Sequence, residues 1–251
     1  MLASAGRRPE QLSLRKILAI WAAATLPMGA AAWMAAPFLA RATGGPNAQP
    51  KALLVTLSLG LVWQFVLVVG LVYREQGSLR WSTVRAVLWL RSPESPGSGR
   101  RGGRLWLVVA LMIAGLALVE AIPAIPHPVD RDLGQFLGTP AGHAFLRGAW
   151  GWLGVILVLL VFNTVLGEEL LFRGLLLPRM NRVFGRFDWL ANGVLFALYH
   201  VHTPWTIPAV LVDSVFLAYP ARRYRSALIS ILAHSAQSVL ILGLATALVL
   251  R

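Results

Sequence analysis

Apolar and polar positions fall in long blocks along this chain. Continuous apolar segments separated by short polar connectors lie near residues 17–40, 52–73, 105–123, 146–172, 189–201, 206–219 and 226–250. Several reach the roughly 20 residues that a helix needs to cross the hydrocarbon of a bilayer. The pattern predicts an all-α fold, a polytopic membrane helical bundle of about seven transmembrane helices. The segments at 189–201 and 206–219 are short, so we expect core helices sheltered by their neighbours.

Composition agrees with this prediction. The chain of 251 residues is 57% hydrophobic and 13% charged, and its mean hydropathy is +0.66. Soluble domains carry about twice that share of charge. The chain has no cysteine, which excludes disulfides and thiolate chemistry and leaves histidine and carboxylate side chains as the strong metal ligands.

The net charge of +13 is, by itself, compatible with a protein that binds nucleic acid. The arginines cluster in connectors between apolar segments, however, so the lipid bilayer is the predicted partner and no nucleic acid is expected. The connector 74–104 alone holds seven arginines and two glutamates. Within it, residues 83–91 predict a short interfacial helix, and the stretch rich in Gly, Ser and Pro that follows predicts a flexible connector.

Loop charge also predicts orientation. Seven spans place the connector 74–104 on the same side as three other basic clusters, namely Arg7, Arg8, Arg15 and Lys16, then Arg179, Arg182 and Arg186, and finally Arg222, Arg223 and Arg225. Basic loops stay cytoplasmic, so the N-terminus is predicted inside and the C-terminus outside. The first apolar segment has no convincing cleavage site and is expected to remain as a span. Arginine-rich, lysine-poor usage favours a bacterial inner (plasma) membrane.

The segment Gly167–Met180, GEELLFRGLLLPRM, places three charges in an apolar surrounding. A charge in hydrocarbon costs about 2.5–3.5 kcal/mol even on lenient scales. Glu169 and Arg173 are four residues apart and share a helical face, whereas Glu168 points roughly 100° away. The spacing predicts a structural ion pair and one free glutamate.

Two further apolar segments carry polar side chains in helical register. Asn192, Phe196 and His200 recur every four residues, and His234 and Ser238 share a face of the last segment. A single buried histidine is more often a satisfied core residue than a catalyst. In this chain the candidate positions occur in three apolar segments, which shifts the balance toward a functional site.

These positions are predicted to lie at a similar depth. Glu168 is twelve residues before Met180, and His200 and His234 follow the charged residues 188 and 225 by twelve and nine. At about 1.5 Å per residue, the depths are roughly 18, 18 and 14 Å. One polar layer is therefore able to contain all three side chains.

The motifs in this order resemble a known family. EELLFR fits the pattern EExxxR, FALYH fits FxxxH, and HSAQS fits the first position of HxxxN. The chain resembles, over residues 146–250, the intramembrane proteases that include CAAX prenyl endopeptidases and bacteriocin-processing or immunity proteins. The resemblance implies a catalytic helical core at 146–251, preceded at 1–145 by N-terminal membrane helices and a cytoplasmic loop.

The resemblance also implies roles for these residues. Glu168 and His200 would activate water, and His234 would stabilise the tetrahedral intermediate. Glu169 and Arg173 would hold the first motif in shape, with Asn192 and Phe196 as structural support. Ser238 stands where the family has Asn; its hydroxyl still donates, but it is shorter than an amide. Losing an oxyanion donor costs about a hundred- to a thousandfold in rate. Ser238 in place of Asn therefore bears on the rate of catalysis and does not by itself imply an inactive protein.

The sequence leaves alternatives open for both the cofactor and the function. A metal-free glutamate mechanism is favoured, but Glu168, His200 and His234 also make a His₂Glu set of the kind that catalytic zinc uses. The predicted function is an intramembrane endopeptidase acting on a membrane-associated protein or peptide. The alternatives are a non-catalytic membrane scaffold or immunity protein, and a proton-coupled transporter, because buried ionisable groups also build ion relays.

Other polar residues have plainer interpretations. Asp213 is expected to make a structural hydrogen bond near the same polar layer. Glu120 is expected to reach the membrane interface. His127, His143 and His202 lie at or beyond the predicted ends of spans and are expected at the surface.

Overall fold

The regular structure of this protein is helical. A computed structural model describes residues 9–122 and 125–251; Arg7 and Arg8 of the predicted basic cluster lie outside the described residues. Within these ranges the only β-type pairing is a single antiparallel bridge between Glu94 and Arg101. The all-α prediction is confirmed, and a helix occurs in each of the seven predicted apolar segments.

Four helical segments of the described ranges are long and apolar enough to cross a membrane. The first, Leu14–Thr43, joins α1 (Leu14–Ala30) to α2 (Ala36–Thr43) through a π-helical turn; the others are α3 (Ala48–Gln76), the segment Trp150–Arg179 that begins with α8 (Trp150–Val161), and α12 (Ala227–Val249). The remaining apolar segments form α5 (Leu107–Val119), α10 (Asp188–Tyr199) and α11 (Ile207–Tyr224). Short helices lie at the two ends of the bundle: α4 (Trp81–Val87) and α9 (Asn181–Phe184) at one, α6 (Leu133–Leu137) and α7 (Pro140–Leu146) at the other.

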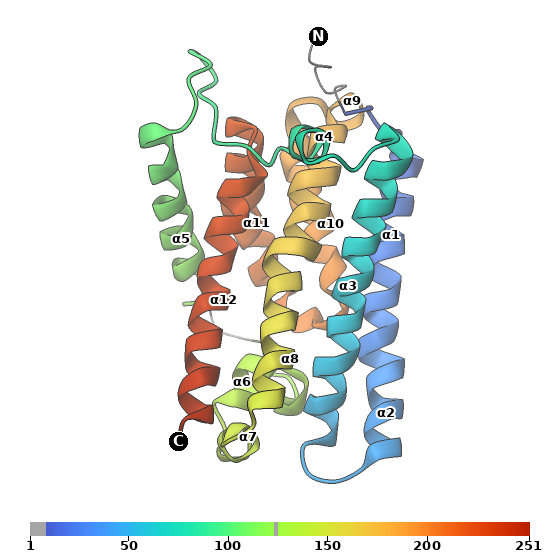
Figure 1. Cartoon of the computed structure of the whole chain (residues 1–251), viewed down its shortest axis with the longest axis vertical. Coiled ribbons are helices and arrows are strands. Elements are labelled where there is room, and N and C mark those ends of the chain that lie inside the picture. The colour runs from blue at the N-terminus through green and yellow to red at the C-terminus, as the bar shows by residue number, and fades with distance from the viewer. Residues whose placement is uncertain (1–8, 123–124) are drawn as a thin grey trace.

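The shorter helices stop inside the bundle. Figure 1 shows α3 and α12 running its full height, while α5 ends within it and α10 and α11 form a hairpin whose connection lies inside. The prediction of a short helix is confirmed for α10, which has 12 residues, whereas α11 has 18 residues and runs beyond the predicted segment to Tyr224. The turn of this hairpin, residues 200–206, therefore lies part-way along the bundle.

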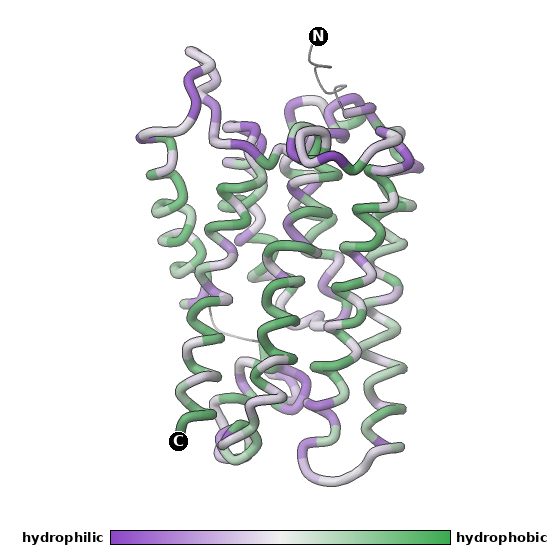
Figure 2. Tube along the Cα trace, viewed as in Figure 1, coloured by the Kyte–Doolittle hydropathy of each residue, from purple (hydrophilic) through white to green (hydrophobic). Residues whose placement is uncertain are grey.

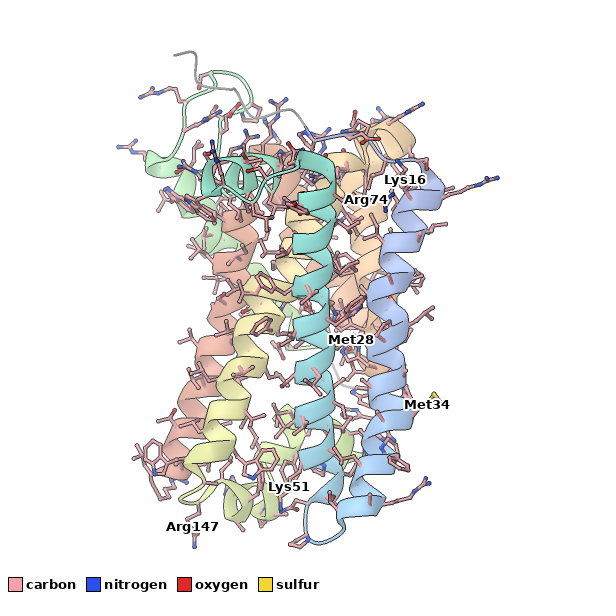
Figure 3. The ribbon with its side chains drawn as sticks, turned by 45° about the vertical axis from the view of Figure 1, so that its right-hand side comes forward. Lys16, Met28, Met34, Lys51, Arg74 and Arg147 are labelled. Carbon is pink, nitrogen blue, oxygen red and sulfur yellow. The ribbon has the colours of Figure 1, made fainter. Side chains whose placement is uncertain are left out.

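The basic connectors share one end of the molecule, as predicted. The start of α1, the end of α3, α9 and the turn between α11 and α12 all lie at the end near the N-terminus, and the C-terminus lies at the opposite end (Figure 1). Lys16 and Arg74 extend from the first end, and Lys51 and Arg147 from the other (Figure 3). The predicted interfacial helix is α4, which lies across the basic end of the bundle.

The outer surface is apolar along the middle of the bundle. Figure 2 shows hydrophobic segments between two more polar ends. Met34 and Leu111 are each 72% exposed, and Leu240 is 75% exposed. An apolar surface of this extent is stable against lipid and not against water. The protein is an integral membrane protein.

Close packing fixes the hairpin of α10 and α11. A Cβ atom added to Gly193 would lie 2.8 Å from the Cβ of Ser214, so only glycine allows this approach. The Ser214 hydroxyl donates to the Gly193 carbonyl at 3.2 Å. Small residues at such contacts are typical of membrane helices, whose association depends on packing. The contact holds the hairpin turn, and with it His200, in place.

Candidate active site

The first motif lies in an irregular part of its helix. The segment Trp150–Arg179 is π-helical at Phe162–Gly167 and again at Leu170–Leu176, with Glu168 and Glu169 between them. The uniform α-helix assumed from the sequence is therefore wrong here. A π-helical turn widens the backbone and re-aims side chains, and such turns are frequent at functional sites. A Cβ atom on Gly167 would lie 2.5 Å from the Phe162 carbonyl oxygen, so this turn requires glycine.

The predicted ion pair is present and includes a third residue. Arg173 Nε lies 3.6 Å from Glu169 Oε2, and both side chains are fully buried. The other oxygen of Glu169 lies 3.1 Å from His234 Nδ1. The guanidinium of Arg173 also sits 4.0 Å from the ring centroid of Phe196. Glu169 thus joins the first motif to α12, and Phe196 covers the arginine through a cation–π contact.

Glu168 has different surroundings from its neighbour. It is buried, and it interacts with the hydroxyl of Tyr199. That hydroxyl accepts a hydrogen bond of 2.6 Å from Gln64 Nε2 on α3. Neither residue was among the site residues that the sequence indicated. Gln64 was detectable as a lone amide inside an apolar helix, but its partner was not.

His200 follows the last turn of α10, in a short 3₁₀ turn. Its Nδ1 lies 2.9 Å from the Phe196 carbonyl oxygen, to which an Nδ1–H group donates. The second ring nitrogen, Nε2, is then left as an acceptor. The ring of His202 stacks on that of His200, with centroids 5.2 Å apart. The expectation that His202 is a surface residue was wrong, because the chain turns back into the bundle at this point.

Two adjoining cavities bring the motifs together. A cavity of about 340 Å³ is lined by Glu168, His200 and His202, with an apolar wall from α3 and Met28. A second cavity, of about 460 Å³, is lined by His200, His234 and Asp213. His200 belongs to both walls. The structure therefore places these motif residues around one region within the bundle.

The predicted division of the chain at residue 145 does not divide the cavities. The wall of the first one includes Met28 and Leu53 from the N-terminal part and Leu160 from the C-terminal part. Figure 3 shows Met28 between the helices. Both parts are needed to enclose the space beside Glu168.

Asn192 and Ser238 do not line either cavity. Asn192 Nδ2 donates to the Phe172 carbonyl oxygen at 2.8 Å, which ties α10 to the helix of the first motif. The Ser238 hydroxyl lies 3.3 Å from Thr164 Oγ1, in the π-helical stretch before Glu168. Thr164 was missed in the sequence because a threonine in an apolar helix commonly bonds only its own preceding turn.

The chain just before α6, which contributes to the walls of both cavities, contains a second histidine for which the prediction was wrong. His127 was expected at the surface, but its side chain is only 4% exposed and lies 3.4 Å from Asp132. Its ring stacks on Trp205, with centroids 4.5 Å apart and planes at 4°. Trp205 Nε1 in turn donates to Asp132 at 3.3 Å. These contacts join the chain before α6 to the turn of the α10–α11 hairpin.

Asp213 and Glu120 lie beside the second cavity. Asp213 Oδ1 is buried and has no hydrogen-bond partner in the described residues, so the expected structural hydrogen bond of that oxygen is not seen. Glu120 was expected at the membrane interface. It follows the end of α5, is exposed, and accepts a hydrogen bond of 3.1 Å from Gln237 on α12. Its position at the membrane interface stays a prediction.

The described residues contain no group of three or more His, Cys, Asp or Glu side chains arranged to hold a metal ion. The zinc alternative of Glu168, His200 and His234 is thus not assembled as a ligand set in this conformation.

Comparison with known families supports the motif assignment. Residues 149–240, a little over a third of the chain, match the family described as type II CAAX prenyl endopeptidase Rce1-like. The resemblance to the CAAX proteases is confirmed. The matched range contains both glutamates of the first motif, His200 and His234. Comparisons with curated proteins and with solved structures give no significant match. The CAAX protease match supports a peptidase, with a peptide as its class of substrate.

Proposed function

We propose that this protein is an intramembrane endopeptidase that hydrolyses a peptide bond of a membrane-associated protein or peptide with water activated by Glu168 and His200. The observation that carries the proposal is that these two side chains line the same cavity inside a membrane bundle. A carboxylate and an imidazole on one largely apolar cavity are what general base catalysis requires.

In this mechanism Glu168 takes a proton from a water molecule as the water oxygen bonds to the carbonyl carbon of the substrate. His200 accepts a hydrogen bond from the same water through Nε2, since Nδ1 is committed to the Phe196 carbonyl. Glu168 then passes the proton to the amide nitrogen as the carbon–nitrogen bond breaks. The products are one new carboxyl terminus and one new amino terminus.

His234 is the proposed donor to the oxyanion. Its Nδ1 pairs with Glu169, so the proposed donor is an N–H group on Nε2. His234 lines the second cavity beside His200, so that N–H has access to the same region. A donor held in place before the reaction stabilises the developing charge without reorganisation.

Ser238 and Asn192 act in this proposal by positioning. Ser238 contacts Thr164 and so holds α12 against the helix that carries Glu168. Asn192 holds α10, and therefore His200, against the same helix. Glu169 and Arg173 support the site through their buried pair. We further propose a bacterial inner membrane with the basic end of the bundle in the cytoplasm, because positive charge is retained on that side.

The test compares the termini of membrane proteins by mass spectrometry in cells that express wild type, Glu168→Gln or Glu10→Gln at matched levels. Gln preserves the volume of Glu168 and removes the base, and Glu10 is an exposed control outside the walls of both cavities. Particular cleaved termini should disappear with Glu168→Gln alone, because loss of a general base lowers rates by about a hundred- to ten-thousandfold. Identical termini in all three samples would support the scaffold or transport alternative.

Metal dependence is tested separately on the purified protein with a substrate found in that comparison. Cleavage should continue at the same rate after treatment with a chelator, since the mechanism uses only side chains and water. Loss of cleavage that added zinc restores would replace this mechanism with one based on zinc.

A further inference from the structure

A pocket lies at the basic end of the bundle, away from the cavities described above. It has a volume of about 320 Å³ and is bounded by the start of α10, the end of α11 and the connector that follows α4. Four arginines and one glutamate contribute charge to its walls: Arg186, Arg222, Arg223, Arg225 and Glu94. The proposed peptidase function does not involve this pocket.

The positive charge of the pocket is not balanced by its acidic neighbours. Arg222 is paired with Asp188 at 2.6 Å. Glu94 is bound mainly by Arg101 at 2.7 Å, and Arg225 approaches it only to 3.9 Å. The hydrogen bond from Arg101 lowers the pKa of Glu94 below its usual value, so Glu94 stays ionised and is already neutralised. Within the described residues Arg186 and Arg223 have no ion-pair partner.

The walls of the pocket are held by hydrogen bonds between distant segments. The amide of Glu94 donates to the Tyr224 carbonyl oxygen at 2.9 Å. The Ser226 hydroxyl donates to the Arg91 carbonyl oxygen at 2.5 Å, and Arg91 Nε donates to the Arg225 carbonyl oxygen at 2.9 Å. The connector predicted to be flexible is thus attached at Glu94 to the end of α11, and Arg91, just before it, is attached to the turn between α11 and α12. The arginines of that turn are presented on a fixed backbone.

The pocket lies at the depth expected for lipid headgroups. The membrane-length helices begin or end at this end of the bundle, at Leu14, Gln76, Arg179 and Ala227. The rings of Trp189 and Tyr219 form a T-shaped pair in its wall, with centroids 5.3 Å apart. Aromatic side chains of this kind concentrate at the boundary between hydrocarbon and headgroups.

We infer that this pocket binds the phosphate of an anionic phospholipid headgroup, with Arg186 and Arg223 as its main ligands. A guanidinium group offers paired N–H donors that match phosphate oxygens, and basic pockets between membrane helices recognise acidic headgroups in this way. Trp189 and Tyr219 would contact the glycerol and upper acyl region of the same lipid. The inference rests on the membrane position of the chain and does not depend on protease activity.

The test measures lipid retention by native mass spectrometry after reconstitution in equal amounts of phosphatidylglycerol and phosphatidylcholine. Wild type is compared with the double variant Arg186→Gln, Arg223→Gln and with a control, Arg74→Gln, Arg80→Gln. The control removes the same charge from exposed positions at the same end of the bundle, outside the pocket. The pocket variant should lose affinity for phosphatidylglycerol by about fivefold for each arginine, and the control should retain more lipid than the pocket variant.

Equal losses in both double variants would overturn the inference, because they would indicate general attraction by surface charge. No loss in the pocket variant would overturn it as well. A parallel titration with inorganic phosphate distinguishes the source of the anion. Binding of phosphate alone, with displacement of the lipid, would show a soluble ligand instead of a lipid. All four positions are exposed, so thermal unfolding of each variant should match that of wild type.

Discussion

At the residue scale, two adjacent glutamates have separate environments. Glu169 is neutralised by Arg173 and His234, whereas Glu168 interacts with Tyr199 and borders a cavity. The sequence alone predicted that one would be paired and the other free. It also identified the partner Arg173, because residues four apart meet on one helical face. It missed the contact with His234, which joins residues 65 positions apart.

Loss of the buried arginine should be costly. Arg173→Met is expected to reduce the free energy of unfolding by about 3–5 kcal/mol, because it leaves Glu169 buried with only His234 as a partner. Adding Glu169→Gln to the same chain should recover part of that loss. Unfolding of the detergent-solubilised variants measures both effects. A cost below about 1 kcal/mol for Arg173→Met would indicate that water reaches the pair.

Tyr199→Phe tests the hydroxyl beside Glu168. The phenyl ring keeps the contacts of Tyr199 with Phe172 and Phe196 but leaves Gln64 Nε2 without its acceptor. An unsatisfied buried donor costs about 1–3 kcal/mol of stability. We also expect kcat to fall with little change in KM, since the hydroxyl orients Glu168 and lines neither cavity. The variant Gln64→Leu, Tyr199→Phe should recover stability but not kcat; recovery of both would assign the hydroxyl a purely structural role.

At the scale of elements, the π-helical stretches determine where the first motif points. They depend on contacts that hydrophobic periodicity does not encode, because α- and π-helices differ by about one residue in their hydrogen-bond spacing. Helix positions were predicted well from the apolar segments. The inner ends of α10 and α11 were also predicted within two residues. What the apolar segments did not predict is that α5 and this hairpin end part-way along the bundle, since a helix can stop inside a membrane only where surrounding protein satisfies its backbone.

Gly167→Ala should therefore affect the protein far more than Gly154→Ala on the same helix. The added Cβ would lie 2.5 Å from the Phe162 carbonyl oxygen at position 167, and it would meet nothing within 4 Å at position 154. We expect a loss of about 1–3 kcal/mol in unfolding free energy for Gly167→Ala. The control should be neutral or slightly stabilising. Equal thermal stability of the two variants would show that the π-helical turn is not maintained in the membrane.

At the scale of the whole molecule, the connector 74–104 and the turns at 179–188 and 222–226 lie at one end of the bundle, together with the start of α1 (Figure 1). This arrangement followed from counting apolar segments and charges, even though three of those segments form short or more polar helices. Counting seven spans still placed the later connectors correctly, because the α10–α11 hairpin enters and leaves the bundle at the same end. Two complete spans would return the chain to that end as well.

Single cysteines test the orientation directly, because the natural chain has none. In intact bacterial cells a membrane-impermeant maleimide should label Lys51→Cys and Arg147→Cys, which lie at the end away from the basic connectors. Lys16→Cys and Arg74→Cys, at the basic end, should react only after the cells are opened. Labelling of Arg74→Cys in intact cells would reverse the proposed orientation.

The sequence by itself determined the class of the protein, the approximate helices, the shared end of the basic connectors and the motif residues. These depend on local hydropathy, charge and helical spacing, which are properties of neighbouring residues. Only the tertiary structure decided the contact of His234 with Glu169, the place of His202 in the wall of the first cavity, the burial of the His127 side chain, and the wall that Met28 gives to that cavity. Those features join segments far apart in the chain, and their geometry is set by packing across the whole bundle.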